Sequence, residues 1–188
     1  MSDIMTIKAV VCPACGELGK AEIFTSVNVT KHPGLRDKVL GGGMFAWTCP
    51  SCGYNARLTY PILYNDMKNR FMVYFIPRVE RFQLCDRELE EAYSSLRGIS
   101  KRVVPNFNAF KEKIFIFESR LDDMAIELAK VAISQTVSKK LDGVKDATVS
   151  FMTQKMTIEA EDERFDEVVK AAVKCIAKVE PDCRVILK

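Results

Sequence analysis

Two copies of one short motif predict the fold class of this chain. Residues 12–16 read Cys-Pro-Ala-Cys-Gly and residues 49–53 read Cys-Pro-Ser-Cys-Gly, and each copy lies between two predicted strands. The last third of the chain has the pattern helix–strand–strand–helix–strand. We therefore expect an α+β protein: a zinc-ribbon-like β domain with helices over residues 1–130, followed by a truncated ferredoxin-like (split βαβ) tail over residues 131–188.

The two motifs predict a metal site. In each, proline fixes the backbone after the first cysteine and glycine permits a left-handed turn after the second. Two such turns facing each other offer four thiolates in the tetrahedral arrangement that zinc prefers. We expect Cys12, Cys15, Cys49 and Cys52 to bind one structural Zn²⁺. Iron and a redox-active dithiol are alternatives, although the duplication favours one shared metal.

The spacing between the two pairs is unusual for a ribbon. The 33 residues from Gly16 to Thr48 exceed the common spacing of about 15–20. The excess is accounted for if residues 30–43 form an excursion from a ribbon hairpin, with a helical turn or two at 33–40.

Hydrophobic periodicity predicts the other elements of the first domain. Strands are expected at 7–11, 21–30, 45–48, 71–76 and 101–104, the last an edge strand, and a helix capped by Asn106 or Asn108 is expected through 117. Residues 54–60 lead out of the second turn, and residues 79–96 receive no assignment. The aromatic residues of 71–76 could suggest a stacking platform for bases, but their alternation with aliphatic residues favours a buried core strand.

The tail is predicted from the same kind of pattern. A helix should start at Leu121-Asp122-Asp123 and end at Gly143, with Met124, Leu128, Val131, Val137 and Leu141 on its apolar face. A hairpin with its turn near 153–155 follows. A second helix has Val168, Ala172, Cys175 and Val179 on one face, and a short last strand is expected at 184–187.

Composition limits the function classes. Of 188 residues, 48% are hydrophobic and 28% charged, which indicates a globular protein with a real core. The net charge of +3 divides into +4 over residues 1–118 and −1 over residues 119–188, which argues against a dedicated nucleic-acid binder. The sequence shows no signal-peptide pattern and no apolar run of about 20 residues, so we expect a cytoplasmic protein without a membrane segment.

Few other residues suggest chemistry. His32 is the only histidine and lies in the excursion, where a surface loop position is the simpler interpretation than a base or ligand. Cys175 falls on an apolar helical face and is expected to be a core thiol. Cys85 and Cys183 have no ligand-pair spacing. We find no catalytic constellation and expect no enzyme.

Separated motifs in the first two-thirds resemble the CpXC domain family. They are Cys12-Pro-Ala-Cys, Ser26-Val-Asn-Val-Thr, Thr48-Cys-Pro-Ser-Cys-Gly, Tyr60-Pro-Ile-Leu-Tyr-Asn-Asp-Met, Ile114-Phe-Ile-Phe-Glu and Leu121-Asp-Asp, over about residues 5–130. The resemblance implies zinc binding through the four cysteines and carries no established activity.

The tail resembles heavy-metal-associated domains. The similar segments are 141–144, 147–151, 153–158 and 165–169. Those domains hold a soft metal with a Cys-x-x-Cys loop, which this tail lacks, so a packing or docking role is the alternative to metal carrying.

We accordingly expect a zinc-binding protein that acts as a non-enzymatic interaction module for an unknown protein partner. Metal handling or sensing is the alternative, and weak nucleic-acid binding is a further one. A homodimer is compatible with the long helix and the incomplete tail sheet.

Overall fold

The computed structural model describes residues 4–79, 86–150, 155–179 and 186. The chain divides into two compact units, Met1–Arg120 and Leu121–Lys188. The boundary expected after residue 130 falls inside α4 (Asp123–Lys140), a continuous helix whose N-terminus is capped by Asp122. The division between the compact units precedes this helix, and the expected domain boundary after residue 130 stays a prediction.

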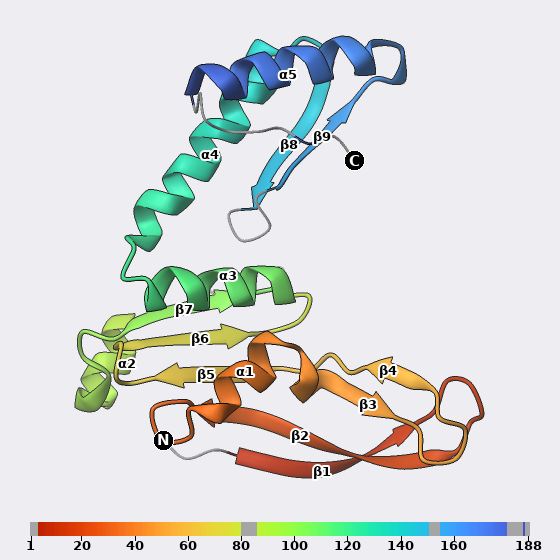
Figure 1. Cartoon of the computed structure of the whole chain (residues 1–188). Helices are drawn as coiled ribbons and strands as arrows, with labels where there is room; N and C mark the ends of the chain where they lie inside the picture. The colour runs from red at the N-terminus through yellow and green to blue at the C-terminus, as the bar shows by residue number, and fades with distance from the viewer. Residues whose placement is uncertain (1–3, 80–85, 151–154, 180–185, 187–188) are drawn as a thin grey trace. The chain divides into compact units, whose positions relative to one another are not determined.

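The first unit is built on a mixed five-stranded sheet (Figure 1). Its order is β1-β2-β5-β6-β7, in which β1 pairs antiparallel with β2, β2 parallel with β5, β5 antiparallel with β6, and β6 parallel with β7. The strands are β1 (Ile4–Val11), β2 (Leu18–Asn28), β5 (Ile62–Asp66), β6 (Phe71–Phe75) and β7 (Ser100–Val104). Four of them confirm predicted strands, including β7 at the edge, whereas β5 was not predicted.

A separate two-stranded hairpin carries the second cysteine motif. It consists of β3 (Ala46–Thr48) and β4 (Asn55–Arg57), so each motif lies between two strands as expected. The excursion before it contains α1 (Gly34–Leu40) and the 3₁₀ turn η1 (Gly43–Phe45). The strand predicted at 45–48 therefore starts one residue later.

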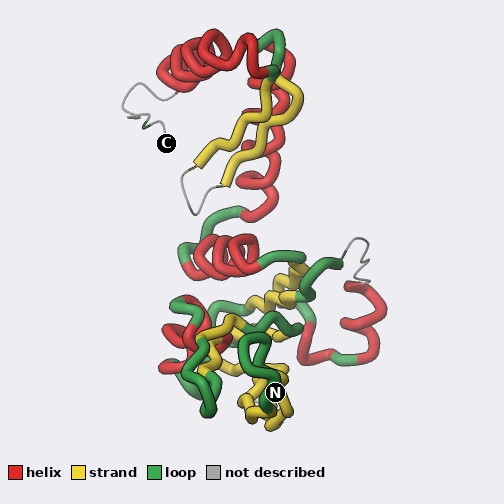
Figure 2. The backbone as a smooth tube through the Cα atoms, turned by 90° about the vertical axis from the view of Figure 1, so that its right-hand side faces the viewer, coloured by secondary structure: helices red, strands yellow, loops and turns green. Residues whose placement is uncertain are grey.

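Helices lie on both sides of this sheet. Figure 2 shows α1 and α2 (Asp86–Ala92) on opposite sides of the strands. The 3₁₀ turn η2 (Ser94–Leu96) follows α2. The helix α3 (Phe107–Glu118) packs against β6 and β7, and the Asn106 side chain accepts a hydrogen bond from the backbone N–H of Ala109 at 2.8 Å. The first of the two predicted caps is thus the correct one.

An ion pair joins α1 to α3. The Arg36 guanidinium donates to both carboxylate oxygens of Glu118 at 2.8 Å, and the Tyr64 hydroxyl donates to Glu118 at 3.3 Å. Burial, together with the negative charge of Glu118, raises the pKa of the Tyr64 hydroxyl. This bidentate geometry fixes the excursion over the sheet.

The core of the first unit is aromatic. Phe71 and Phe75 on β6 are buried, which confirms the core interpretation of residues 71–76, and only Tyr74 on the opposite face is exposed. The Phe75 ring lies 5.6 Å from that of Phe110 on α3. The Phe45 ring lies 6.3 Å from that of Phe75, so the hairpin and α3 share one core with the sheet.

The second unit has the predicted order of helix, strand, strand and helix. After α4 come β8 (Val144–Ser150), β9 (Lys155–Ala160), the 3₁₀ turn η3 (Asp162–Arg164) and α5 (Phe165–Val179). Strands β8 and β9 pair antiparallel, and their predicted turn, like the predicted last strand at 184–187, falls mainly outside the described residues. Val137, Ala147, Val168 and Ala172 form the buried centre of this unit.

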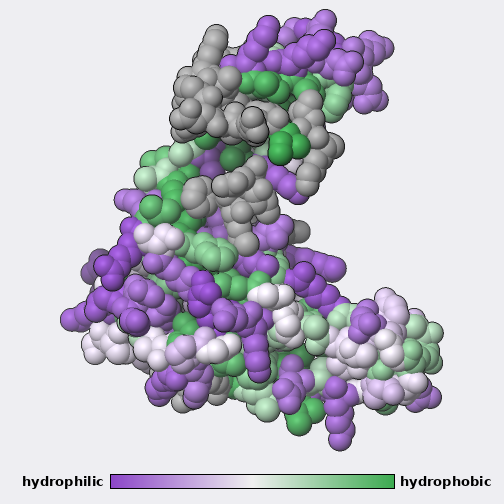
Figure 3. Space-filling view, viewed as in Figure 1, coloured by the Kyte–Doolittle hydropathy of each residue, from purple (hydrophilic) through white to green (hydrophobic). Residues whose placement is uncertain are grey.

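The N-terminal half of α4 exposes its apolar face. Met124, Leu128 and Val131 are 60%, 63% and 50% exposed, whereas Val137 near the other end is buried. Apolar surface accordingly shows on this helix in the space-filling view (Figure 3). No helix among the described residues is both long and apolar enough to cross a membrane.

A glycine allows the β3–β4 hairpin to pack on β2. A Cβ atom at Gly19 would lie 2.5 Å from Cζ2 of Trp47, and the Trp47 indole N–H donates to the carbonyl of Lys20 at 3.1 Å. We predict that Gly19→Ala lowers the free energy of unfolding by about 1–3 kcal/mol, because the indole must shift in a packed site. Urea unfolding followed by the fluorescence of this single tryptophan measures the change.

Gly34→Ala is the matched control, since a Cβ atom at Gly34 meets nothing within 4 Å. It should leave the stability unchanged or slightly raised. Equal destabilisation by both substitutions would contradict the steric explanation.

Candidate metal centre

The two cysteine motifs form the same turn. In each, the glycine N–H donates to the carbonyl of the first cysteine: Gly16 to Cys12 at 2.9 Å and Gly53 to Cys49 at 3.0 Å. Their φ angles, 75° and 73°, lie in the left-handed region that favours glycine. The repeated sequence therefore encodes a repeated local structure.

A second matched hydrogen bond joins each turn to its flanking strands. The Cys12 N–H donates to the carbonyl of Glu17 at 2.9 Å, and the Cys49 N–H donates to that of Tyr54, also at 2.9 Å. Each turn thus closes its own hairpin, β1–β2 or β3–β4. The backbone hydrogen bonds of the two turns therefore help to position the cysteines.

The four sulfur atoms face one another. The Sγ atoms of Cys12 and Cys52 lie 3.7 Å apart, those of Cys15 and Cys49 also lie 3.7 Å apart, and all four lie within 4.8 Å of one another. Tetrahedral zinc with Zn–S bonds of about 2.3 Å requires sulfur separations of about 3.8 Å. A disulfide requires about 2.05 Å. The donor set therefore fits a metal ion with four thiolate ligands.

The site is half buried. The first cysteine of each motif, Cys12 or Cys49, is 1% or 2% exposed, whereas Cys15 and Cys52 are exposed. One side of a bound ion would therefore be covered by protein and the other would lie near solvent.

The electrostatics of the cluster also favour a cation. Backbone N–H groups of Cys52 and Ser51 lower the pKa of the Cys49 thiol to about 6. The Glu17 N–H acts in the same direction on Cys15, but burial and the three neighbouring sulfurs raise the pKa of Cys15 to about 12. Four adjacent thiolates would repel one another, so the four thiols do not all ionise together easily. A bound dication would offset this repulsion and stabilise the thiolate forms.

Of the other candidates, the structure describes the side chain of His32 alone, and this residue is not a member of the cluster. His32 is exposed in the loop before α1, and its backbone N–H donates to the carbonyl of Asn28 at 2.9 Å. Cys175 lies on α5 of the second unit, although its side chain is not among those described. Cys85 and Cys183 lie outside the described residues.

Sequence reasoning missed the residues that support the cluster. Trp47 and Gly19 attach the β3–β4 hairpin to β2, as described above, and a Cβ atom at Gly19 would also lie 3.1 Å from Pro50 of the second motif. The only available signal was a glycine within a predicted β segment, which can mark a close backbone approach.

Comparison with known protein families identifies a matching family model. The family model described as CpXC protein matches residues 10–130, a segment that includes all four clustered cysteines. No curated protein and no solved structure matches the chain.

We predict that the untagged protein contains one zinc ion per chain, measured by mass spectrometry. Changing any one of Cys12, Cys15, Cys49 or Cys52 to Ser should remove most of the metal, because hydroxyls are poor ligands for zinc at neutral pH. Cys85→Ser is the control and should retain a full equivalent. Full metal retention by the four single variants would contradict the assignment.

We predict that Gly16→Ala and Gly53→Ala each lower the free energy of unfolding of the metal-loaded protein by about 1–2 kcal/mol. The expected cost is conformational, because φ is positive at both glycines and residues with a Cβ atom disfavour that region. It is not steric, because a Cβ atom would meet nothing within 4 Å at either position. Chemical denaturation measures it. The variants Gly16→Asn and Gly53→Asn should lose less, because asparagine tolerates left-handed φ better; equal losses would argue against this explanation.

Proposed function

The chain belongs to the CpXC protein family, and we propose that it is a zinc-binding, non-enzymatic interaction module whose metal has a structural role. The proposed docking element is the β1–β2 hairpin. The observation that carries the proposal is that two of the four clustered cysteines, Cys12 and Cys15, belong to the same hairpin as the most exposed strand of the sheet: β1 ends at Val11, and Cys12 follows directly.

The coordination shell supports a structural metal. Four thiolates complete a tetrahedral site, whereas a catalytic zinc keeps one position open for water or substrate. With a single histidine in the sequence, His32, the chain also offers few groups for acid–base chemistry near neutral pH. Metal-binding energy would then contribute to folding and not to a reaction.

Exposed apolar side chains on β1 and β2 support an interaction role. Seven of the eight residues of β1 are exposed and Val10 is half-buried. Ile7 and Val11 are 63% and 61% exposed, and Leu18, which pairs with Val11 in the hairpin, is 68% exposed. Adjacent exposed apolar residues on a β surface are typical of a contact site.

The position of β1 indicates how a partner would bind. It lies at the edge of the sheet beside β2 (Figure 1), so one side of its backbone pairs with no strand among the described residues. An extended protein segment could add to this edge by main-chain hydrogen bonds, with Ile7 and Val11 providing side-chain contacts. The proposed partner is therefore a protein segment in extended conformation.

Metal handling and nucleic-acid binding remain alternatives to the proposed interaction role. Among the described residues, no second group of metal-binding side chains accompanies the cysteine cluster, so metal handling receives no added support. The mild positive charge of residues 1–118 gives little support to nucleic-acid binding. The proposed setting is the cytoplasm, where a reducing environment preserves thiolates.

We predict that Ile7→Asn combined with Val11→Asn abolishes binding of the partners that the wild-type protein captures from its own cells. Quantitative mass spectrometry of captured proteins measures the loss. Because both side chains are exposed, the free energy of unfolding should change by no more than about 0.5 kcal/mol per site.

The matched control is Thr6→Asn combined with Lys8→Gln, on the opposite face of the same strand. It should retain the captured set. Light scattering of the purified protein determines whether a second copy is the partner, in which case the apolar-face variant should be monomeric. Identical capture by both double variants would contradict the proposed surface.

A further inference from the structure

The four clustered cysteines differ in their exposure, although the two motifs form the same turn. The first cysteine of each motif is buried: Cys12 is 1% and Cys49 is 2% exposed. The second cysteine of each motif, Cys15 or Cys52, is exposed. We call Cys12 and Cys49 the inner pair, and Cys15 and Cys52 the outer pair. Each hairpin therefore supplies one inner and one outer ligand to a bound metal.

The inner pair is part of the core of the first unit. Cys12 and Cys49 both belong to the cluster of buried residues that also contains Trp47. Their backbone N–H groups are held as well, by the hydrogen bonds to the carbonyls of Glu17 and Tyr54. Removing an inner sulfur from a bound metal would require this packed region to open locally, which costs free energy.

Open space adjoins the outer pair. A turn glycine follows each outer cysteine, and a Cβ atom at Gly16 or Gly53 would meet nothing within 4 Å. Ala14 and Ser51, which precede the outer cysteines, are exposed and have short side chains. The sequence neighbours of each outer cysteine therefore leave room for an approaching ligand.

The outer cysteines can also leave a metal with little change in the backbone. The two hydrogen bonds that close the first turn join the Gly16 N–H to the Cys12 carbonyl and the Cys12 N–H to the Glu17 carbonyl, and the second turn has the matching pair. These bonds use backbone atoms alone, so rotation of an outer side chain about χ1 toward solvent does not break them. Release of an outer thiolate is therefore a side-chain movement.

We propose that zinc exchanges through the solvent side of this site, and that an external thiol or nitrogen ligand displaces Cys15 or Cys52 first. Zinc accepts a fifth ligand transiently, so the incoming ligand binds before an outer sulfur leaves. In this step a donor atom of the ligand forms a bond to zinc, the bond from zinc to one outer sulfur breaks, and the released thiolate takes up a proton from water. The inner pair leaves last.

This inference deepens the proposed function and rests on it in one respect, the role of the β1–β2 hairpin as the docking element. Cys12 and Cys15 lie in the turn that directly follows β1. Zinc that exchanges with external ligands would stabilise this turn in proportion to its occupancy. Partner binding would then follow the concentration of available zinc, which makes zinc a regulator of the docking surface.

The first test measures zinc transfer from the full-length, zinc-loaded protein to the chelator pyridylazoresorcinol, whose zinc complex absorbs visible light. We expect the transfer rate to rise in proportion to the chelator concentration, because the chelator takes part in the displacement step. A rate independent of the chelator concentration would overturn the proposal, since zinc would then leave only after the site had opened by itself.

The second test identifies the sulfurs that react first. The zinc-loaded protein is treated with a limiting amount of N-ethylmaleimide, and the alkylated positions are assigned by tandem mass spectrometry. Cys15 and Cys52 should react at least about tenfold faster than Cys12 and Cys49, because reaction at a buried sulfur requires local opening. Equal modification of all four cysteines would also overturn the proposal.

Histidine substitutions provide matched variants, since an imidazole nitrogen is also a zinc ligand. Cys15→His and Cys52→His should retain a full equivalent of zinc, because open space adjoins both positions. Cys12→His and Cys49→His should lose most of it, because a larger side chain does not fit a packed site. The reverse result would contradict the assignment of the inner and outer pairs.

These measurements need no partner, so failure of the exchange is distinguishable from failure of the docking surface. If exchange fails but the β1–β2 hairpin is the docking element, the zinc-loaded protein still captures its partners. If the docking surface fails, zinc transfer and the order of alkylation are unchanged.

Discussion

The junction of four sulfur atoms is the constraint on which the first unit depends. It connects the turn after β1 to the turn after β3, two segments separated by the whole excursion that contains α1. The β3–β4 hairpin has only three residues in each strand, and an isolated ladder of that length is not stable in water. Its position therefore depends on attachments at its two ends: the sulfur cluster with Trp47 at one, and the ring of Phe45 in the aromatic core at the other.

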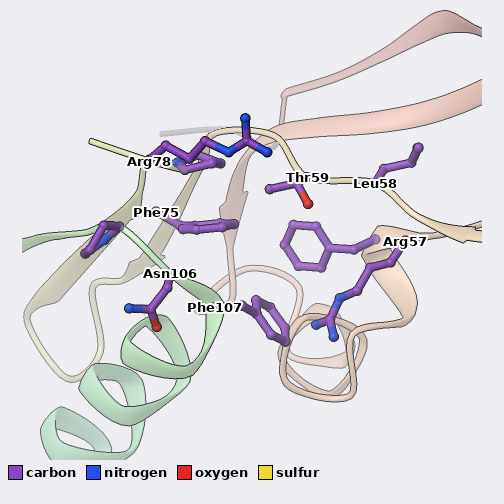
Figure 4. Close-up of a pocket in the computed structure, with 10 residues that line it drawn as sticks. Arg57, Leu58, Thr59, Phe75, Arg78, Asn106 and Phe107 are labelled. Atoms are coloured by element: carbon purple, nitrogen blue, oxygen red, sulfur yellow. The ribbon is translucent and has the colours of Figure 1, made fainter. Parts of the chain in front are cut away.

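The same short hairpin connects the metal centre to the aromatic core. Its turn carries Cys49 and Cys52, whereas its open end carries Phe45 and Arg57, where the Leu58 N–H donates to the carbonyl of Phe45 at 2.8 Å. Three residue pairs span about 10 Å, so the sulfur cluster and the aromatic core lie at opposite ends of one small hairpin. Arg57, the last residue of β4, stacks on Phe107 at the core end, with its guanidinium carbon 4.1 Å from the ring centroid (Figure 4).

The sequence predicted those features of the fold that depend on interactions between residues close together in the chain. The two turns follow from Cys-Pro-x-Cys-Gly, and the cap at Asn106, one of two that the sequence offered, follows from a side chain that accepts a backbone hydrogen bond three residues on. Parallel pairing of β2 with β5 was not predictable in this way, because register between distant strands is set by the assembled core. The contact between Arg57 and Phe107 was not predicted for the same reason: the two residues are far apart in the sequence, and only the fold brings them together. Periodicity likewise located the apolar face of α4, but it could not distinguish exposed Leu128 from buried Val137.

The exposure of β1 would give a bound metal a role beyond holding two turns together. This strand contributes almost no buried side chains, so its order depends on the ladder with β2 and on the turn that follows Val11. Strands with few buried contacts open at low free-energy cost, and a partner that binds the ordered form must offset that cost. A metal at Cys12 and Cys15 would restrain the end of the hairpin and reduce the cost before any partner arrives. Metal occupancy and partner affinity would then be coupled through one strand, without any contact between the metal and the partner.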